Sequence, residues 1–285
     1  MKLQNVDRFF DSTPLRDAYT NANFGVGQLD LFDDSKRDGV TVLRRVLSVV
    51  AQWTPPPRGV LSFTGENWLV GLSYPDVFKG QVIRKRFILH RSDGICQFLT
   101  GDELLTAGAT GLKAHASKAW VKDVKDISTT SDLQSQYVVY AAKSEALAQG
   151  MFVRFPDGTT LLARNSYSAV SGFRALECSE LEPDALTTVQ LTLQRPTYDP
   201  VLETYATVAP VAVPAIVTRF LDDYEFRNEK MPDAFIGDLR VRVRAVDAVG
   251  VQAGDSIALN SKSWKILSVD PREDSTLSMH VRTAA

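Results

Sequence analysis

The sequence predicts a mainly β protein built of small antiparallel β-barrel or sandwich units with hairpin repeats and few short helices. Three stretches share one pattern: a glycine, a short apolar-alternating run, a tight polar turn and a second alternating run. They are residues 59–70, 150–162 and 254–266. In each stretch five positions separate the apolar residue before the turn from its equivalent after it, a spacing that suits a β-hairpin with a short loop. The matching positions are Phe63 and Trp68, Phe155 and Thr160, and Leu259 and Trp264.

The N-terminal third reads as loops followed by strands. Residues 21–39 are rich in Asn, Gly and Asp, which is typical of loops and turns. Residues 40–52 are strongly apolar and β-branched, which favours a strand, although the imperfect alternation leaves a helix open. Residues 81–90 partly alternate between apolar and basic side chains, as in a half-buried strand.

The middle of the chain predicts one short helix among further strands. A cap at Thr100 or Asp102 begins a helix that includes residues 103–107. Residues 126–136 form a polar connection, and residues 143–148 fit a single helical turn. The strand-like runs here are residues 136–140, 171–178 and 187–193.

The C-terminal part begins with a proline-rich stretch. Residues 195–214 contain four prolines and predict a semi-rigid, extended linker. Residues 218–236 mix charged and aromatic side chains, as in an arm or loop. Residues 238–246 alternate almost perfectly, and residues 275–282 form a closing strand after the third hairpin. About four strands in about 45 residues are typical of a small antiparallel barrel or meander.

These elements predict three regions. Residues 1–195 form an N-terminal, mostly-β region that holds one or two hairpin-based units, the latter split near residues 125–136. Residues 196–236 form the proline-rich linker and extended arm, and residues 237–285 form a C-terminal small β-barrel. The sequence favours two domains with a boundary near the linker, and leaves open whether the hairpins belong to three barrels or to two.

Composition excludes several classes of protein. With 44% apolar and 23% charged residues the chain has enough apolar side chains for packed cores, and its net charge of −2 gives no basic field for nucleic acid. The longest apolar run, residues 208–217, is interrupted by prolines and too short to span a bilayer, and the N-terminus predicts no signal peptide. Cys96 and Cys178 fit no metal spacing and predict reduced, partly buried thiols, with a disulfide left open.

No constellation of catalytic side chains stands out. His90, His115 and His280 form no close pair with another histidine or a cysteine, so metal ligation has little support. Phosphate-binding loops, nucleophile elbows and dinucleotide fingerprints are absent from the sequence. The acidic cluster at residues 222–225 predicts a solvated segment, with divalent-cation binding as the alternative. We therefore expect no catalytic, metal or cofactor site and no enzymatic activity.

The alternating arginines near the C-terminus have two interpretations. Arg240, Arg242 and Arg244 lie two apart in a predicted strand and so share one of its faces. The stripe can face a polyanion or an acidic partner, or it can be a solvated face balanced by Asp238 and Asp247. By contrast, Trp68 and Trp264 occupy matching positions in two hairpins and predict a shared core position rather than a ligand site.

The C-terminal hairpin carries a family resemblance. The segment Gly254-Asp-Ser-Ile, followed by Trp264-Lys-Ile and a Val-Asp-Pro turn, resembles the small β-barrel head-tail connector proteins of tailed bacteriophages, most specifically over residues 240–285. The resemblance implies a homo-oligomeric ring in the virion neck, of the adaptor, stopper or head-closure type. Such a ring lies between the portal or adaptor above and the tail terminator or tube below. It surrounds the DNA channel without sequence-specific binding and needs no cofactor, membrane or catalysis.

The resemblance directs attention to subunit contacts in a particle made in the host cytoplasm. Candidate contacts are Phe220, Tyr224 and Phe226 of the arm, together with the three arginines. The irregular segments 21–39, 92–111 and 220–232 are expected to contact neighbouring rings, and strand addition is the expected mode of assembly. The alternatives are a tail-associated or baseplate protein, a carbohydrate- or peptide-binding β module, and an enzyme with scattered acidic residues.

Overall fold

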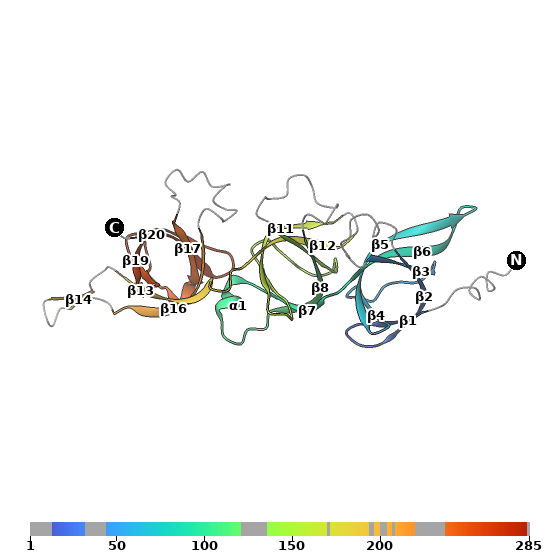
Figure 1. The fold of residues 1–285 in the computed structure, drawn as a ribbon, viewed down its shortest axis with the longest axis horizontal. Coiled ribbons are helices and arrows are strands. Elements are labelled where there is room, and N and C mark those ends of the chain that lie inside the picture. The colour runs from blue at the N-terminus through green and yellow to red at the C-terminus, as the bar shows by residue number, and fades with distance from the viewer. Residues whose placement is uncertain are drawn as a thin grey trace. The chain divides into compact units, whose positions relative to one another are not determined.

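The structure is a computed structural model that describes residues 13–31, 44–120, 136–169, 172–193, 197–199, 204–206, 209–219 and 237–283. Within these residues the chain forms three closed antiparallel barrels of six strands each and a separate two-stranded sheet (Figure 1). The mainly β fold with hairpin repeats is therefore confirmed, and the open question of two or three barrels is answered. None of the helices in the described ranges is long and apolar enough to cross a membrane.

The first and second barrels follow one another along the chain. The strands of the first barrel are β1 (Thr13–Asp17), β2 (Asn23–Leu31), β3 (Arg44–Val50), β4 (Val60–Phe63), β5 (Glu66–Phe78) and β6 (Gln81–Arg91). The strands of the second are β7 (Gly94–Leu99), β8 (Leu112–Trp120), β9 (Tyr137–Ala141), β10 (Phe152–Arg154), β11 (Thr160–Ser168) and β12 (Arg174–Glu180). Because β7 starts directly after β6, the predicted split near residues 125–136 is wrong.

The third barrel takes in more of the chain than its hairpin predicts. Its strands are β13 (Leu186–Thr192), β16 (Val211–Arg219), β17 (Leu239–Arg244), β18 (Ser256–Leu259), β19 (Lys262–Pro271) and β20 (Thr276–Thr283), with the 3₁₀ turn η5 (Ala245–Asp247) after β17. Strands β14 (Thr197–Asp199) and β15 (Thr204–Ala206) form the two-stranded sheet. The predicted domain start at residue 237 is therefore wrong, because β13 and β16 complete this barrel.

A proline inside β16 explains why this strand was predicted as part of a linker. Pro214 pairs with Thr188 of β13, whereas the pairing of β16 with β17 begins only at Ala215. At Pro214 the strand therefore has a neighbour on one side only, and a residue without an N–H is tolerated where no second strand needs the donor.

All three barrels share one topology. When the strands of each barrel are numbered in chain order, their spatial order is 1-2-3-6-5-4, and the fourth strand closes against the first. The three predicted hairpins occupy the same place in this scheme, as strands four and five of each barrel. The repeat in the sequence therefore corresponds to a fold repeated three times.

The hairpin turns and the paired tryptophans behave as predicted. Thr64 and Gly65 have φ angles of 50° and 78°, and Asn260 and Ser261 have φ angles of 51° and 61°. Two consecutive residues with positive φ make the type I′ turns that match the strand twist of a two-residue hairpin loop. Trp68 and Trp264 are both buried, each within the core of its own barrel, so the predicted shared core position is confirmed.

Close packing in the first barrel explains one misread segment. Residues 23–31, predicted as loop because of their Gly, Asn and Asp content, form β2. A Cβ atom on Gly27 would lie 2.5 Å from Cδ1 of Leu47, so the strand crosses the core where only a glycine fits. Loop-like composition here reflects tight packing rather than irregular structure.

The single described α-helix, α1 (Gly101–Leu105), begins as predicted at Thr100. The Thr100 hydroxyl accepts a hydrogen bond from the Glu103 amide, and the Glu103 carboxylate accepts one from the Thr100 amide, which completes a capping box. Residues 143–148, predicted as a helical turn, instead form a non-helical turn and coil. By mutual contact the described residues divide into two compact units, one holding the first two barrels and the other holding the third barrel with α1.

Candidate functional site

The first and second barrels are joined by a shared apolar cluster. Val60, Leu69 and Ile88 of the first barrel pack with Val138 and Phe173 of the second. The fully buried ring of His90 lies 4.8 Å from the ring of Tyr140 and 4.6 Å from that of Phe173. These contacts hold the two barrels together as one body.

A polar cluster borders this apolar contact, and its first member is placed by a tight turn. Asp17 ends β1 with a buried side chain whose Oδ1 accepts hydrogen bonds from the Tyr19 and Thr20 amides, at 2.8 and 2.7 Å. An aspartate that caps the backbone two and three residues ahead fixes such a turn. It directs the Tyr19 ring at the second barrel.

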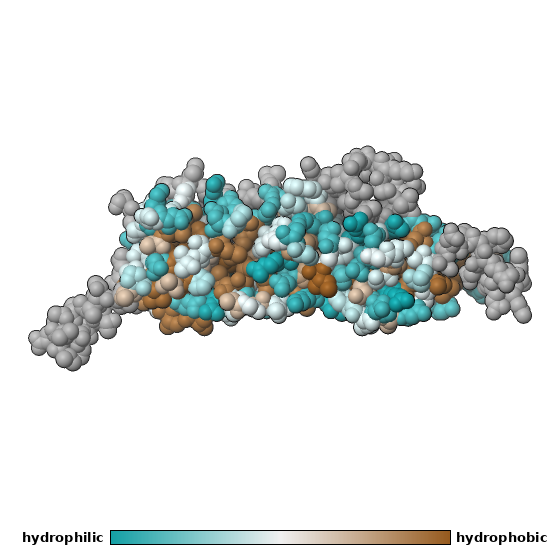
Figure 2. All heavy atoms as spheres, turned by 60° about the horizontal axis from the view of Figure 1, so that its bottom comes forward, coloured by the Kyte–Doolittle hydropathy of each residue, from teal (hydrophilic) through white to brown (hydrophobic). Residues whose placement is uncertain are grey.

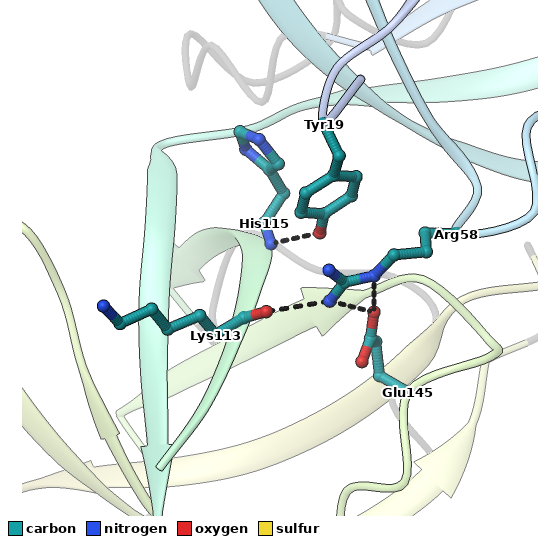
Figure 3. Close-up of polar contacts among 5 residues, drawn as sticks. All are labelled: Tyr19, Arg58, Lys113, His115 and Glu145. Atoms are coloured by element: carbon teal, nitrogen blue, oxygen red, sulfur yellow. Dashed lines mark hydrogen bonds and ion pairs between the residues drawn. The ribbon is translucent and has the colours of Figure 1, made fainter. Parts of the chain in front are cut away.

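The Tyr19 hydroxyl reaches a backbone amide of the second barrel. It accepts a hydrogen bond of 3.0 Å from the His115 N–H (Figure 3). The pairing of β8 with β9 begins only at Ala116, so a side chain from another barrel supplies the acceptor that a neighbouring strand would give. The rings of Tyr19 and His115 also meet edge to face, with centroids 5.1 Å apart.

Arg58 links the same two barrels through its charge. It follows the prolines that end the β3–β4 connection, and its guanidinium lies 3.9 Å from the centre of the Tyr19 ring. It donates to Oε1 of Glu145 at 3.0 and 3.3 Å and to the Lys113 carbonyl at 2.8 Å (Figure 3). The Glu145 side chain is 8% exposed and that of Arg58 is 41% exposed, so the carboxylate is the more buried partner.

Burial sets the protonation of this cluster. Burial lowers the pKa of His115, and the positive charge of Arg58 lowers it further. Burial also raises the pKa of Tyr19, against the opposing effects of the hydrogen bond from His115 and the charge of Arg58. Both rings are therefore favoured in their neutral forms, which suits a packed junction between domains.

The cluster contains one pair that resembles a nucleophile and its base. The Ser92 hydroxyl lies 3.0 Å from Nδ1 of His115. The same hydroxyl also contacts the Gly94 and Ala116 carbonyls and accepts from the Gly94 amide. These bonds brace the β6–β7 connection, so the arrangement favours a structural role for the pair. Across the described ranges no three His, Cys, Asp or Glu side chains gather as metal ligands.

The predicted arginine stripe is only partly solvent-facing. The alternation is confirmed, because Val241 and Val243 lie in the core while the arginines face outward from it. The guanidinium of Arg242 lies 5.8 Å from the centre of the Phe152 ring. The idea of one solvated face is wrong for Arg240, which is 3% exposed. A role of these arginines as subunit contacts stays a prediction.

The two acids expected to balance the stripe have different partners. Asp247 forms a two-pronged pair with Arg244, at 2.6 and 2.7 Å, and Arg244 also donates to the Thr106 hydroxyl. Asp238 is buried, contacts Nε2 of His280 at 2.7 Å and accepts two hydrogen bonds from Arg282. Arg244 therefore ties the end of α1 to the third barrel, and the Asp238 group ties β20 to the start of β17.

Other predicted contacts have mixed outcomes. Phe220, Tyr224 and Phe226, with the whole 220–232 segment and the acidic cluster, lie outside the described residues. The segment 92–111, predicted as an irregular contact loop, instead contains β7 and α1. The two cysteines, predicted to be partly buried, are free and fully buried in the described residues.

Two surface features were not predicted at all. The paired ends of β5 and β6 extend beyond the body of the first barrel (Figure 1) and expose apolar side chains. An open apolar groove of about 650 Å³ lies on the third barrel. Neither feature has a local sequence signature, because exposure depends on where a strand extends past its neighbours.

Comparison with family models, curated proteins and solved structures finds no match to this chain.

Proposed function

We propose that this chain is a structural virion protein of the neck of a tailed bacteriophage. In this proposal its copies form a ring that connects the portal to the tail and surrounds the DNA channel, and the chain has no enzymatic role. The observation that carries the proposal is the repetition of one closed barrel three times, each with the hairpin whose C-terminal copy has the connector-like Gly254-Asp-Ser-Ile and Trp264-Lys-Ile pattern.

Charge and burial support a structural role. The net charge of −2 gives little attraction for phosphate, which suits the wall of a channel through which DNA must pass. The polar cluster around Arg58 and Glu145 joins two barrels rather than forming an open site. Barrels also leave few free sheet edges, which limits unspecific association of a component made in many copies.

The decisive experiment removes the protein from the infecting phage. A nonsense mutation early in the gene should yield DNA-filled heads and separate tails, because the joining piece is missing, and supplying the protein from a plasmid should restore joined particles. Antibody labelling of purified virions should mark the junction of head and tail. Tails that still join heads, with label at the tail tip, would support a baseplate protein and refute the neck assignment.

One observation favours a second candidate, a carbohydrate-binding β module. Trp120 is 49% exposed, and its ring lies 4.5 Å from that of Tyr137 on the neighbouring strand. Exposed aromatic faces are the surfaces on which sugar rings stack. A screen of soluble glycans by NMR, read from the backbone amide shifts around Trp120 and repeated with Trp120→Ala as the control that should lose those shifts, tests this candidate directly.

A further inference from the structure

The β5–β6 hairpin exposes apolar side chains on both of its faces. Strand β4 pairs with β5 only as far as Leu69, and β3 pairs with β6 only from Arg84 onward. Beyond those points the hairpin is a two-stranded ribbon that ends in the Lys79–Gly80 turn. Its exposed apolar side chains are Tyr74, Val77, Phe78, Val82 and Ile83, with exposed fractions of 44–60%.

Such a ribbon is costly in water. A two-stranded hairpin alone is at best marginally stable, and contiguous exposed apolar surface usually marks an interaction site. Val77 lies directly opposite Val82, whereas Ile83 is one residue further along the strand and so points to the other face. Because both faces are apolar, a concave site covers more of this tip than a flat one does.

The third barrel offers a concave site of matching chemistry. The groove of about 650 Å³ is lined largely by aliphatic side chains, among them Ala248, Val249, Val251, Leu267, Val269 and Leu277. Val249 is 75% exposed. Figure 2 shows hydrophobic residues gathered over the part of the molecule that holds this barrel.

The charges around the two features are opposite. Residues 74–86 carry four basic side chains and one acidic one, a net charge of +3. Residues 267–277, which border the groove, carry three acidic side chains and one arginine, a net charge of −2. Complementary charge around an apolar contact steers association and fixes its register.

We propose that the tip of the β5–β6 hairpin docks in the groove of the third barrel of a second copy of this chain. One chain then carries both halves of a head-to-tail contact, and each copy can use both halves with different neighbours. Contacts of this kind close into rings when the rotation between copies permits. The inference deepens the proposed function, since it rests on the ring and names the contact that builds it.

Crosslinking of the full-length protein tests the contact. The native thiols, Cys96 and Cys178, are fully buried, and burial raises the pKa of the Cys96 thiol to about 12, so only introduced cysteines should react. A mixture of the Phe78→Cys and Val249→Cys variants, treated with a short bis-maleimide, should give a crosslinked dimer. Val26, 58% exposed on β2 of the first barrel, supplies the matched control in a mixture of Phe78→Cys with Val26→Cys.

The expected result is mixed dimer at least ten times more abundant than in the control mixture, with little dimer in either variant alone. In a further variant the crosslinking cysteine is moved to position 77 (Val77→Cys) and Phe78→Asp is added. Mixed with Val249→Cys, this variant should give no crosslinked dimer, while circular dichroism reports an intact fold. Dimer from Phe78→Cys alone would indicate a hairpin-to-hairpin contact and overturn the proposal. Equal dimer yields in the control mixture would also overturn the proposal. So would a chain carrying both Phe78→Cys and Val249→Cys that crosslinks only within itself and forms no dimer.

The two proposals fail separately. If removal of the protein leaves heads and tails unjoined but the mixed dimer does not form, the neck function stands and this contact is wrong. If the mixed dimer forms but heads and tails join without the protein, the contact stands and the neck function is wrong.

Discussion

Replacement of Tyr19 by Phe removes one oxygen atom from the junction between the first two barrels. The hydroxyl is the acceptor for the His115 amide at 3.0 Å, and His115 is 3% exposed. The phenyl ring can keep its edge-to-face contact with His115 and its contact with the Arg58 guanidinium. The substitution therefore isolates a single hydrogen bond across the junction.

The size of the effect follows from the burial of the donor. A buried N–H left without an acceptor costs about 1–3 kcal/mol. Tyr19 itself is only half-buried, so water can partly replace the lost oxygen, and we expect the lower part of that range, about 1–2 kcal/mol. That free energy corresponds to roughly a 5- to 30-fold change in the local opening equilibrium.

Amide hydrogen exchange, followed residue by residue with NMR, measures this opening directly. The His115 amide should exchange roughly 5- to 30-fold faster in the Tyr19→Phe protein, while amides of the third barrel keep their rates. Tyr74→Phe, at a tyrosine that is 49% exposed on the β5–β6 hairpin, is the matched control and should change nothing at His115. An unchanged His115 rate in Tyr19→Phe would show that the hydroxyl does not hold the junction.

Three further predictions concern the same compact unit. Gly172→Ala should lower the free energy of unfolding by about 1–3 kcal/mol more than Gly158→Ala, measured by chemical denaturation. Both glycines have positive φ, but only a Cβ on Gly172 would lie 2.7 Å from a backbone nitrogen, that of Leu72. The pKa of His115, measured by NMR titration, should lie below its usual value of 6.5. The folded state then binds fewer protons at His115 than the unfolded state, so the stability of the protein falls as the pH drops below 6.5. Arg58→Met should raise the pKa of His115 only in part, since burial is the larger cause. Cys96 should resist a thiol reagent in the native protein and react after denaturation, and rapid native labelling would contradict its burial.

Strands with regular alternation and tight turns could be predicted from the sequence. The β17 strand, with valines inside and arginines outside, and the hairpin turns at Thr64–Gly65 and Asn260–Ser261 have local causes that any reader of the chain can find. The spacing of five positions across the turn, the same in all three hairpins, also indicated a repeated unit. The cause is that periodicity and turn chemistry act over a few neighbouring residues.

Features that depend on distant neighbours could not be predicted. Gly27 suits a strand only because Leu47 presses against it, and Pro214 is tolerated only because β17 does not pair there. The junction pair of Arg58 and Glu145 joins residues separated by 87 positions, both in turns without periodic pattern. The basic and apolar alternation near Ile83 predicted a half-buried strand, yet this end is exposed because β6 extends past its neighbour.

A fold repeated three times need not be used three times in the same way. Closure of each barrel satisfies its strand edges, so differences between the barrels are confined to loops and to strands that extend beyond the barrel. The first barrel has extended one hairpin into a ribbon, and the third has an open apolar groove beside its η5 turn. In the proposed head-to-tail contact the ribbon is the projecting element and the groove is the receiving one, so a single chain supplies both halves.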